Sequence, residues 1–221
     1  MNLERYDYRR ESTYKEYLFF SNGPNGRILK VVRFFLVSTR PAHVYILSLG
    51  DWDNEYNEPD YWSVTNNKDT EKVLATVAAI VLDFTNIFRT ALIQVEGNNP
   101  ARTRLYQRTI NKNLYEIEKI FQVLGSIGYE LEEVQKNTCY DSFLFARKEY
   151  VILKEEETDI YMTSSTKKKT EKKRVYNDTV TYSPCLVSED HPFIVEKIER
   201  SRKTLASITN LEEILKKHNL I

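Results

Sequence analysis

The chain has 221 residues, of which 41% are hydrophobic and 29% are charged, a composition that supports a buried core and argues against a protein that lives within a bilayer. Lysine plus arginine and aspartate plus glutamate each total 32 residues, so no net charge draws the whole molecule to nucleic acid or to an acidic membrane. The sequence has no long apolar segment and no signal-peptide core, and we therefore expect a cytoplasmic protein without a membrane partner.

The first third of the chain has the pattern of antiparallel strands. Residues 14–20 are rich in aromatic residues, 21–26 have the Asn, Gly and Pro content of a turn, and 28–37 are mostly β-branched and aromatic, which predicts a hairpin. Residues 43–49 predict a third strand, and an acidic loop then leads to residues 61–65. Three or four strands are expected before the first helix.

Hydrophobic residues that recur at helical spacing predict the first helix. These residues are Val73, Val77, Ile80, Val81, Phe84 and Phe88. Either Asn67 or Asp69 is suited to cap this helix, and residues 90–96 then predict a short buried strand. Asn99 followed by Pro100 is typical of a helix start, because proline is tolerated at the first helical position.

The second helix is predicted by an apolar stripe that faces the sheet. The stripe consists of Tyr106, Ile110, Leu114, Ile117 and Phe121, and Gly125 to Gly128 end or interrupt the segment. Residues 129–134 and 142–148 predict two closing strands. The expected fold is α+β, with a mixed, mostly antiparallel sheet in the order β-β-β-α-β-α-β-β and a helical carboxy-terminal tail.

Three segments are expected along the chain: a domain at 1–152, a charged linker at 153–188 and a helical tail at 189–221. The linker contains the basic run from Lys167 to Arg174, and such charge blocks stay solvated. In the tail, apolar residues between Phe193 and Ile208 predict an amphipathic helix. Thr209 with Glu212 has the spacing of a capping box for a short last helix.

The histidines and cysteines lack the spacing of metal ligands, and we expect no metal site. The two helix starts are the candidate anion-binding or cofactor-binding positions, since free amides at a helix start attract anions and arginine pairs with phosphate. The candidate residues are Asn66, Asn67, Lys68, Asp69, Thr70, Asn99, Arg102 and Arg104. The alternative at each position is a helix cap or a solvated side chain. We expect both helix starts to lie near one edge of the sheet and to face a shared hollow.

Two stretches resemble a bacterial family of unknown function that is common among Bacteroidetes. The first runs from Ser63 to Val77, and the second runs from Pro100 to Tyr106. The resemblance covers about residues 1–150. It implies no activity, because that family has none established.

The predicted order of elements also resembles the core of the GNAT acetyltransferases without their first helices. In those enzymes the amides of a glycine-rich loop bind the pyrophosphate of acetyl-CoA, and residues 66–70 occupy that place here without a glycine. Asn99 and Leu105-Tyr106 are similar to the second helix of that core, and the resemblance implies Tyr106 as the catalytic general acid. Because the glycine loop is missing, we expect no cofactor, with acetyl-CoA or another CoA as the alternative.

The stretch from His191 to Lys203 is similar to small bacterial proteins of toxin–antitoxin-like gene pairs.

Three hypotheses follow for the function. The first is a noncatalytic GNAT-like module that binds a protein partner or a second copy. The second is an acyl-CoA-dependent N-acyltransferase that uses Tyr106. The third is a nucleic-acid-associated protein that uses Lys167 to Arg174 as a basic arm.

Overall fold

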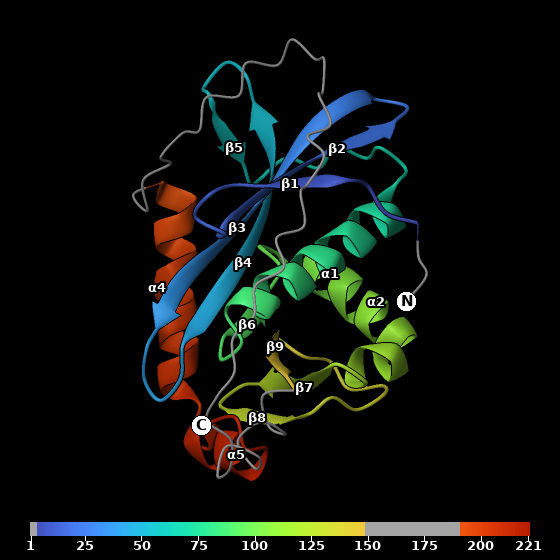
Figure 1. The fold of residues 1–221 in the computed structure, drawn as a ribbon. Coiled ribbons are helices and arrows are strands. Elements are labelled where there is room, and N and C mark those ends of the chain that lie inside the picture. Colours follow the sequence, from blue (N-terminus) through green and yellow to red (C-terminus); the bar gives the residue numbers. More distant parts are fainter. Residues whose placement is uncertain (1–3, 149–190) are drawn as a thin grey trace, which may run out of the picture.

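The computed structural model of the chain describes residues 4–148 and 191–221. They form one sheet with helices on both of its faces (Figure 1). The elements are β1 Tyr8–Arg10, β2 Glu16–Gly23, β3 Gly26–Ser38, β4 Val44–Asp53, β5 Glu58–Asp60, α1 Thr70–Ile87, β6 Leu92–Val95, α2 Pro100–Glu118, β7 Phe121–Ile127, β8 Glu130–Glu133, β9 Ser142–Arg147, α4 Pro192–Ser207 and α5 Leu211–Lys217.

The nine-stranded sheet has the order β1-β2-β3-β4-β6-β9-β7-β8, and β5 pairs with the far part of β4. Among the described strands, β4 and β6 are the one parallel pair, and every other pair is antiparallel. A parallel connection requires a crossover, and here the crossover contains α1. The parallel pair therefore lies in the middle of the sheet, between two antiparallel halves.

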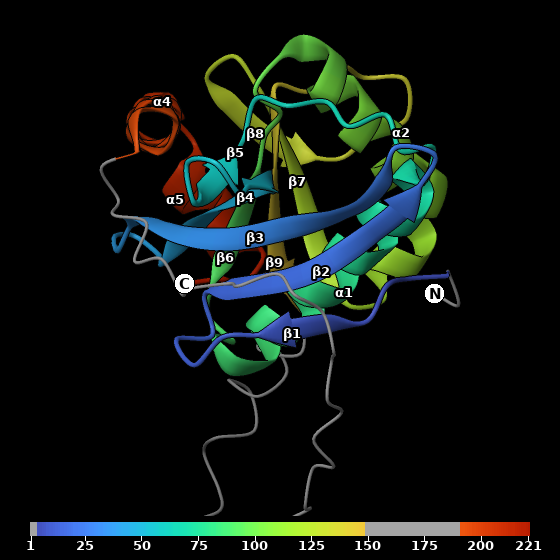
Figure 2. The same cartoon turned by 90° about the horizontal axis from the view of Figure 1, so that it is seen from above.

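Alternating side chains of the central strands bury the two faces of the sheet. On one face Phe34 stacks on Phe84 of α1 at 3.9 Å between ring centroids, and Tyr45 contacts the same ring edge-on. On the other face Phe35 and Ile46 belong to the core that includes Ile194 of α4. Figure 2 shows α4 and α1 on opposite sides of β3 and β4. The period of two along each strand thus produces a three-layer arrangement.

The tail closes the second face of the sheet. The apolar stripe of α4 is buried against β3, β4, β6 and β9, and α5 adds Leu215, which is fully buried. The amphipathic tail helix predicted from residues 193–208 is therefore confirmed in position and extent.

Asn210, rather than the predicted Thr209, precedes α5 as its cap residue. Its side chain bonds the backbone N–H and C=O of Leu131 at 3.1 and 3.0 Å. The predicted capping box of Thr209 and Glu212 does not form, because both the N–H and the hydroxyl of Thr209 donate to the carbonyl of Tyr129, at 3.0 and 3.5 Å.

The α+β class and the mostly antiparallel sheet are confirmed, but the predicted order β-β-β-α-β-α-β-β is incomplete. Two short edge strands, β1 and β5, were not predicted, and residues 61–65 form a loop rather than a strand. The predicted linker at 153–188, with its basic run, lies outside the described residues.

The largest error is β7. The apolar spacing predicts a second helix that continues to Phe121, but α2 ends at Glu118 and Phe121 pairs with Arg147 of β9. Gly125, the first residue of the stretch predicted to end or interrupt this helix, lies inside β7, where a Cβ atom would be only 2.2 Å from the ring of Tyr140. A glycine that makes room for a packed ring looks the same in sequence as a glycine that ends a helix.

Candidate functional site

The middle of the sheet opens where β4 and β6 separate. The two strands pair only over Val44–Ile46 and Leu92–Gln94. Beyond this point β6 ends at Val95, whereas β4 continues and pairs with β5. The opening contains a cavity of about 20 Å³ that we call the central cavity, lined by Leu47, Leu49, Tyr61, Val95, Glu96, Asn98, Arg102, Tyr106, Phe193 and Lys197. This volume holds about one water molecule.

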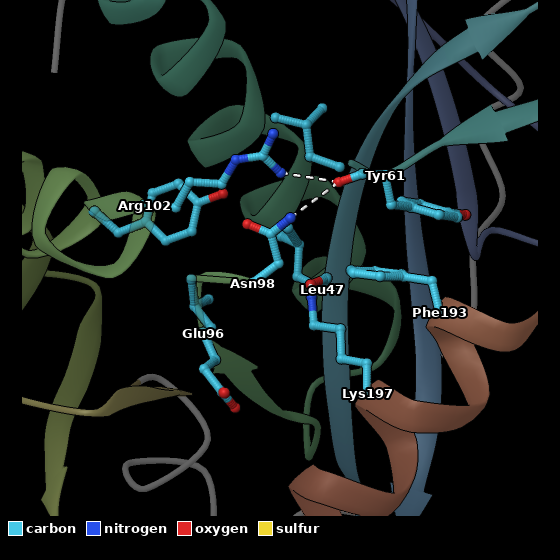
Figure 3. A pocket seen from close by; sticks show the side chains of 10 residues that line it. Leu47, Tyr61, Glu96, Asn98, Arg102, Phe193 and Lys197 are labelled. Atoms are coloured by element: carbon cyan, nitrogen blue, oxygen red, sulfur yellow. Dashed lines mark hydrogen bonds between the residues drawn. The ribbon is translucent and has the colours of Figure 1, made fainter. Parts of the chain in front are cut away.

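Lys197 reaches the opening from α4, as Figure 3 shows. It lies on the buried stripe of that helix, one turn after Phe193 and one turn before Ser201, and it is 5% exposed. Its Nζ donates to the carbonyl oxygen of Leu47 at 2.6 Å and to Oγ of Ser48 at 3.2 Å. Leu47 lies just beyond the residues of β4 that pair with β6, so its carbonyl oxygen has no partner on that strand. The ammonium group supplies the missing hydrogen-bond donor.

Burial lowers the pKa of Lys197 to about 8, and the nearby Glu96 carboxylate partly opposes this shift. Burial also raises the pKa of Glu96, while Arg200 acts in the opposite direction through a 2.9 Å contact. Close by, Ser201 of the same helix donates to the side-chain oxygen of Gln94. A band of polar groups thus crosses the interface between α4 and the sheet, with Lys197 bonded to β4, Ser201 bonded to β6 and Arg200 paired with Glu96.

The start of α2 is tied to the loop that follows β5. Arg102 donates through Nη1 to the carbonyl oxygen of Tyr61 at 2.9 Å and through Nη2 to that of Trp62 at 3.2 Å, and it also bonds the carbonyl of Ser63. Asn98 donates to the same Tyr61 oxygen at 3.3 Å (Figure 3). The guanidinium group is therefore engaged by backbone carbonyls of the chain itself.

The predicted cap of α2 is confirmed. Oδ1 of Asn99 accepts from the N–H of Arg102 at 2.9 Å, and Pro100 occupies the first turn. Gly97 lets the helix start lie directly on the end of β6, since a Cβ atom there would be 2.4 Å from the nitrogen of Thr103. These contacts fix the position of Arg102 and, one turn later, of Tyr106.

The start of α1 packs against the β2–β3 hairpin. Asn67 is 4% exposed, donates to Oγ of Ser21 at 2.8 Å and accepts from the N–H of Asn25 at 2.9 Å. Asp69 precedes α1, but its carboxylate accepts from Ser21 and Tyr6, at 2.6 and 2.8 Å, instead of capping the helix. The polar side chains at this start therefore serve to anchor the hairpin.

The candidate residues from the sequence divide into two groups. Arg102 and Tyr106 line the central cavity, whereas none of residues 66–70 does. Asn66, Lys68 and Thr70 are exposed, and so are Asn99 and Arg104. The two helix starts contact different parts of the loop of residues 61–65, because Arg102 bonds the carbonyls of residues 61–63, whereas Asn25, which also bonds Asn67, donates to the carbonyl of Thr65 at 2.7 Å. The central cavity, which Arg102 lines, therefore contains no residue from the start of α1.

Tyr106 is partly exposed, and burial raises its pKa. Its position beside Lys197 and Glu96 in the central cavity came from the fold and not from the sequence pattern. The lysine was nevertheless visible in the sequence as a charged residue on the apolar stripe of the tail helix, between Ile194 and Ile198. A lysine at such a position needs a buried acceptor, which the chain supplies from β4.

In the described parts of the chain, no cluster of three or more His, Cys, Asp or Glu side chains could hold a metal ion. None of the helices in residues 4–148 and 191–221 combines the length and apolar character needed to cross a bilayer.

Residues 2–148 match DUF6934, a family of unknown function. No curated protein and no solved structure is similar enough to count as a match.

Proposed function

Since the chain belongs to DUF6934, a family of unknown function, we propose that it is a noncatalytic, partner-binding module with a GNAT-like core. The observation that carries this proposal is the occupation of the central cavity by the chain's own groups. Lys197 holds the free carbonyl of β4, and Arg102 holds three carbonyls of the loop after β5. A space of about 20 Å³ remains, which is far below the size of a substrate pocket.

A partner surface is supported by exposed apolar side chains beside this cavity. Trp62 is 57% exposed and Val64 is 66% exposed, although both lie in the loop that Arg102 fixes. The Trp62 ring also packs edge-on against Phe193 of α4 at 4.8 Å. Fixed aromatic side chains lose little entropy on binding and often anchor protein interfaces. The partner in this proposal is a second copy or a small protein encoded by a neighbouring gene, as in toxin–antitoxin-like pairs.

Native mass spectrometry of the full chain, alone and coexpressed with the products of its flanking genes, tests this proposal. We expect a dimer or a stable complex. Trp62→Ser should weaken either assembly by at least tenfold, because the ring would anchor the interface. Tyr115→Ser is the matched control: Tyr115 is 76% exposed on α2, and its replacement should leave the assembly intact. A chain that stays monomeric under all of these conditions contradicts the proposal.

The acyltransferase hypothesis is the second candidate, and the position of Tyr106 in the central cavity supports it. The parallel neighbours β4 and β6 separate in the middle of the sheet, α2 follows β6 directly, and Tyr106 lines the resulting cavity. Binding of acetyl-CoA there would require Lys197 and Arg102 to exchange their carbonyl partners for the ligand. A thermal-shift titration of the full chain with acetyl-CoA and CoA tests this candidate. A saturable increase in Tm that Tyr106→Phe preserves, together with acyl transfer that this variant loses, would replace the noncatalytic proposal.

The nucleic-acid hypothesis has less support from the described residues. A basic face of α2 made of Arg102, Arg104 and Arg108 would be the platform for nucleic acid in this hypothesis. Arg102 is engaged by backbone carbonyls, whereas Arg104 and Arg108 are exposed. The basic arm itself lies outside the described residues. Such an arm would bind through phosphate contacts, so deletion of residues 165–176 should abolish salt-sensitive retention on DNA or RNA.

A further inference from the structure

A second and larger cavity lies at the far end of the tail helix, and we call it the tail cavity. It has a volume of about 250 Å³ and lies between the β3–β4 connection and the helices α4 and α5. The central cavity, in contrast, measures about 20 Å³. The tail cavity therefore has room for an organic molecule, whereas the central cavity does not.

The walls of the tail cavity are mostly apolar. Val37 and Val44 contribute from the strands, and Leu205, Leu211 and Leu215 contribute from the two helices. All five side chains are at least 92% buried, since none exceeds 8% exposure. Their positions are fixed by the same core that joins α4 to the sheet. A preformed apolar cavity of this kind favours an apolar ligand, because no wall has to reorganise.

Two cationic side chains, Arg40 and Arg202, line the same cavity, and no acidic residue does. Both are exposed, so they lie where the cavity meets solvent. Arg202 is held by a hydrogen bond from Nε to the carbonyl oxygen of Val37 at 3.1 Å, which leaves the terminal N–H groups of its guanidinium as donors. The backbone of Arg40 is held by Ser38, whose Oγ donates to the Arg40 carbonyl at 2.7 Å and accepts from its N–H at 3.3 Å.

We propose that the tail cavity binds a small carboxylic acid, with its apolar body between the leucines and its carboxylate on Arg40 and Arg202. Guanidinium groups match the planar, two-oxygen geometry of a carboxylate. An apolar cavity of about 150 Å³ holds a benzene molecule, so the tail cavity, of about 250 Å³ and open to solvent at the two arginines, holds a molecule of about ten non-hydrogen atoms by proportion. The ligand class is thus a medium-chain fatty acid or an aromatic acid of similar size.

Titration of the full chain with octanoate, followed by ¹H–¹⁵N NMR and isothermal calorimetry, tests this inference. We expect saturable shifts of the amides of residues 37–44 and 202–215 and a weaker response to the neutral analogue 1-octanol. Arg40→Gln and Arg202→Gln should each weaken octanoate binding by about tenfold, because each removes a charge-assisted contact. Lys203→Gln is the control, since this exposed neighbour does not line the cavity, and it should bind octanoate like the parent.

Ala206→Phe provides a test that does not depend on charge. Ala206 lines the cavity but is exposed, so a larger side chain can enter the cavity without displacing the core. This variant should keep the parent's NMR spectrum outside the cavity and should lose octanoate binding. The inference is overturned if octanoate shifts no cavity amide, if 1-octanol binds as tightly as octanoate, or if Ala206→Phe binds octanoate unchanged. None of these results bears on whether Trp62 anchors a protein partner.

Discussion

The ammonium group of Lys197 loses its hydration when α4 packs on the sheet, and hydrogen bonds to Leu47 and Ser48 replace only part of it. The charged form is therefore disfavoured in the folded chain, although Glu96 lies close enough to stabilise it. Replacing the lysine by an apolar residue would remove the burial cost but would leave the carbonyl of Leu47 without this donor. These opposing effects make the pH dependence a clearer signal than the stability at one pH.

Lys197→Met should change how stability depends on pH. The folded pKa is lowered from 10.5 to about 8, so between these values the folded chain binds fewer protons than the unfolded chain, and stability rises with pH. The parent should gain roughly 2 kcal/mol over Lys197→Met between pH 7.5 and 9.5, at about 1.4 kcal/mol per pKa unit. Urea unfolding of both proteins at the two pH values measures this gain. Parallel pH profiles would show that Lys197 keeps an ordinary pKa.

Gly125→Ala tests the close approach of β7 to Tyr140. The new Cβ atom would lie 2.2 Å from the ring, and the ring cannot withdraw easily because it is 4% exposed and its hydroxyl donates to Glu132 at 2.8 Å. The free energy of unfolding should fall by about 1–3 kcal/mol, as for other overpacked cores. Gly128→Asn is the control, since that position has φ +55° with open space around it and asparagine tolerates this conformation. Equal effects of both substitutions in urea unfolding would argue against the Tyr140 contact.

At the level of elements, α4 covers one face of the sheet and thereby removes the apolar side chains of that face from solvent. Its stripe combines apolar residues with two polar ones, Lys197 and Ser201, and each polar residue meets a polar group of the sheet. This match fixes the position of the helix along β4 and β6, because a shift by one turn would leave a buried ammonium group without an acceptor. The apolar residues supply most of the stabilisation, and the polar pairs specify the register.

Ile194→Ala should measure how strongly α4 packs on the sheet. Ile194 is fully buried in the core beneath the tail, so the free energy of unfolding should fall by about 2–5 kcal/mol. Val195→Ala on the same helix is the matched control, since Val195 is 38% exposed, and it should change stability by no more than about 0.5 kcal/mol. Urea unfolding followed by circular dichroism gives both values. Similar small effects at the two positions would mean that the tail does not contribute to the core.

At the level of the whole molecule, the spacing of apolar residues predicted the long helices and strands. The short strands and the side-chain contacts of the site depend on tertiary packing, which this spacing does not show. The helices were visible because Val73 to Phe88 and Phe193 to Ile208 keep one period over several turns. The strand β7 was missed because Phe121 continues the helical spacing of α2 by chance, and β5 because a three-residue strand carries almost no pattern. For the candidate site, the sequence named Arg102 as an anion-binding candidate, and the GNAT resemblance implied Tyr106 as the general acid. Neither indicated that Arg102 donates to backbone carbonyls or that Lys197 of α4 lines the cavity.

The docking of the tail predicts that residues 1–152 alone expose a large apolar face. Without α4 and α5, side chains such as Phe35, Ile46 and Leu144 lose the partners that bury them in the common core. A fragment of residues 1–152 should therefore bind a hydrophobic dye, self-associate at micromolar concentration and unfold with little cooperativity. Adding a peptide of residues 189–221 should reverse these changes, because the peptide can supply the missing face in trans. Fluorescence of the dye and analytical ultracentrifugation measure both steps. If the fragment is monomeric, dye-free and cooperative without the peptide, the sheet does not depend on the tail, and the domain predicted at 1–152 is independent.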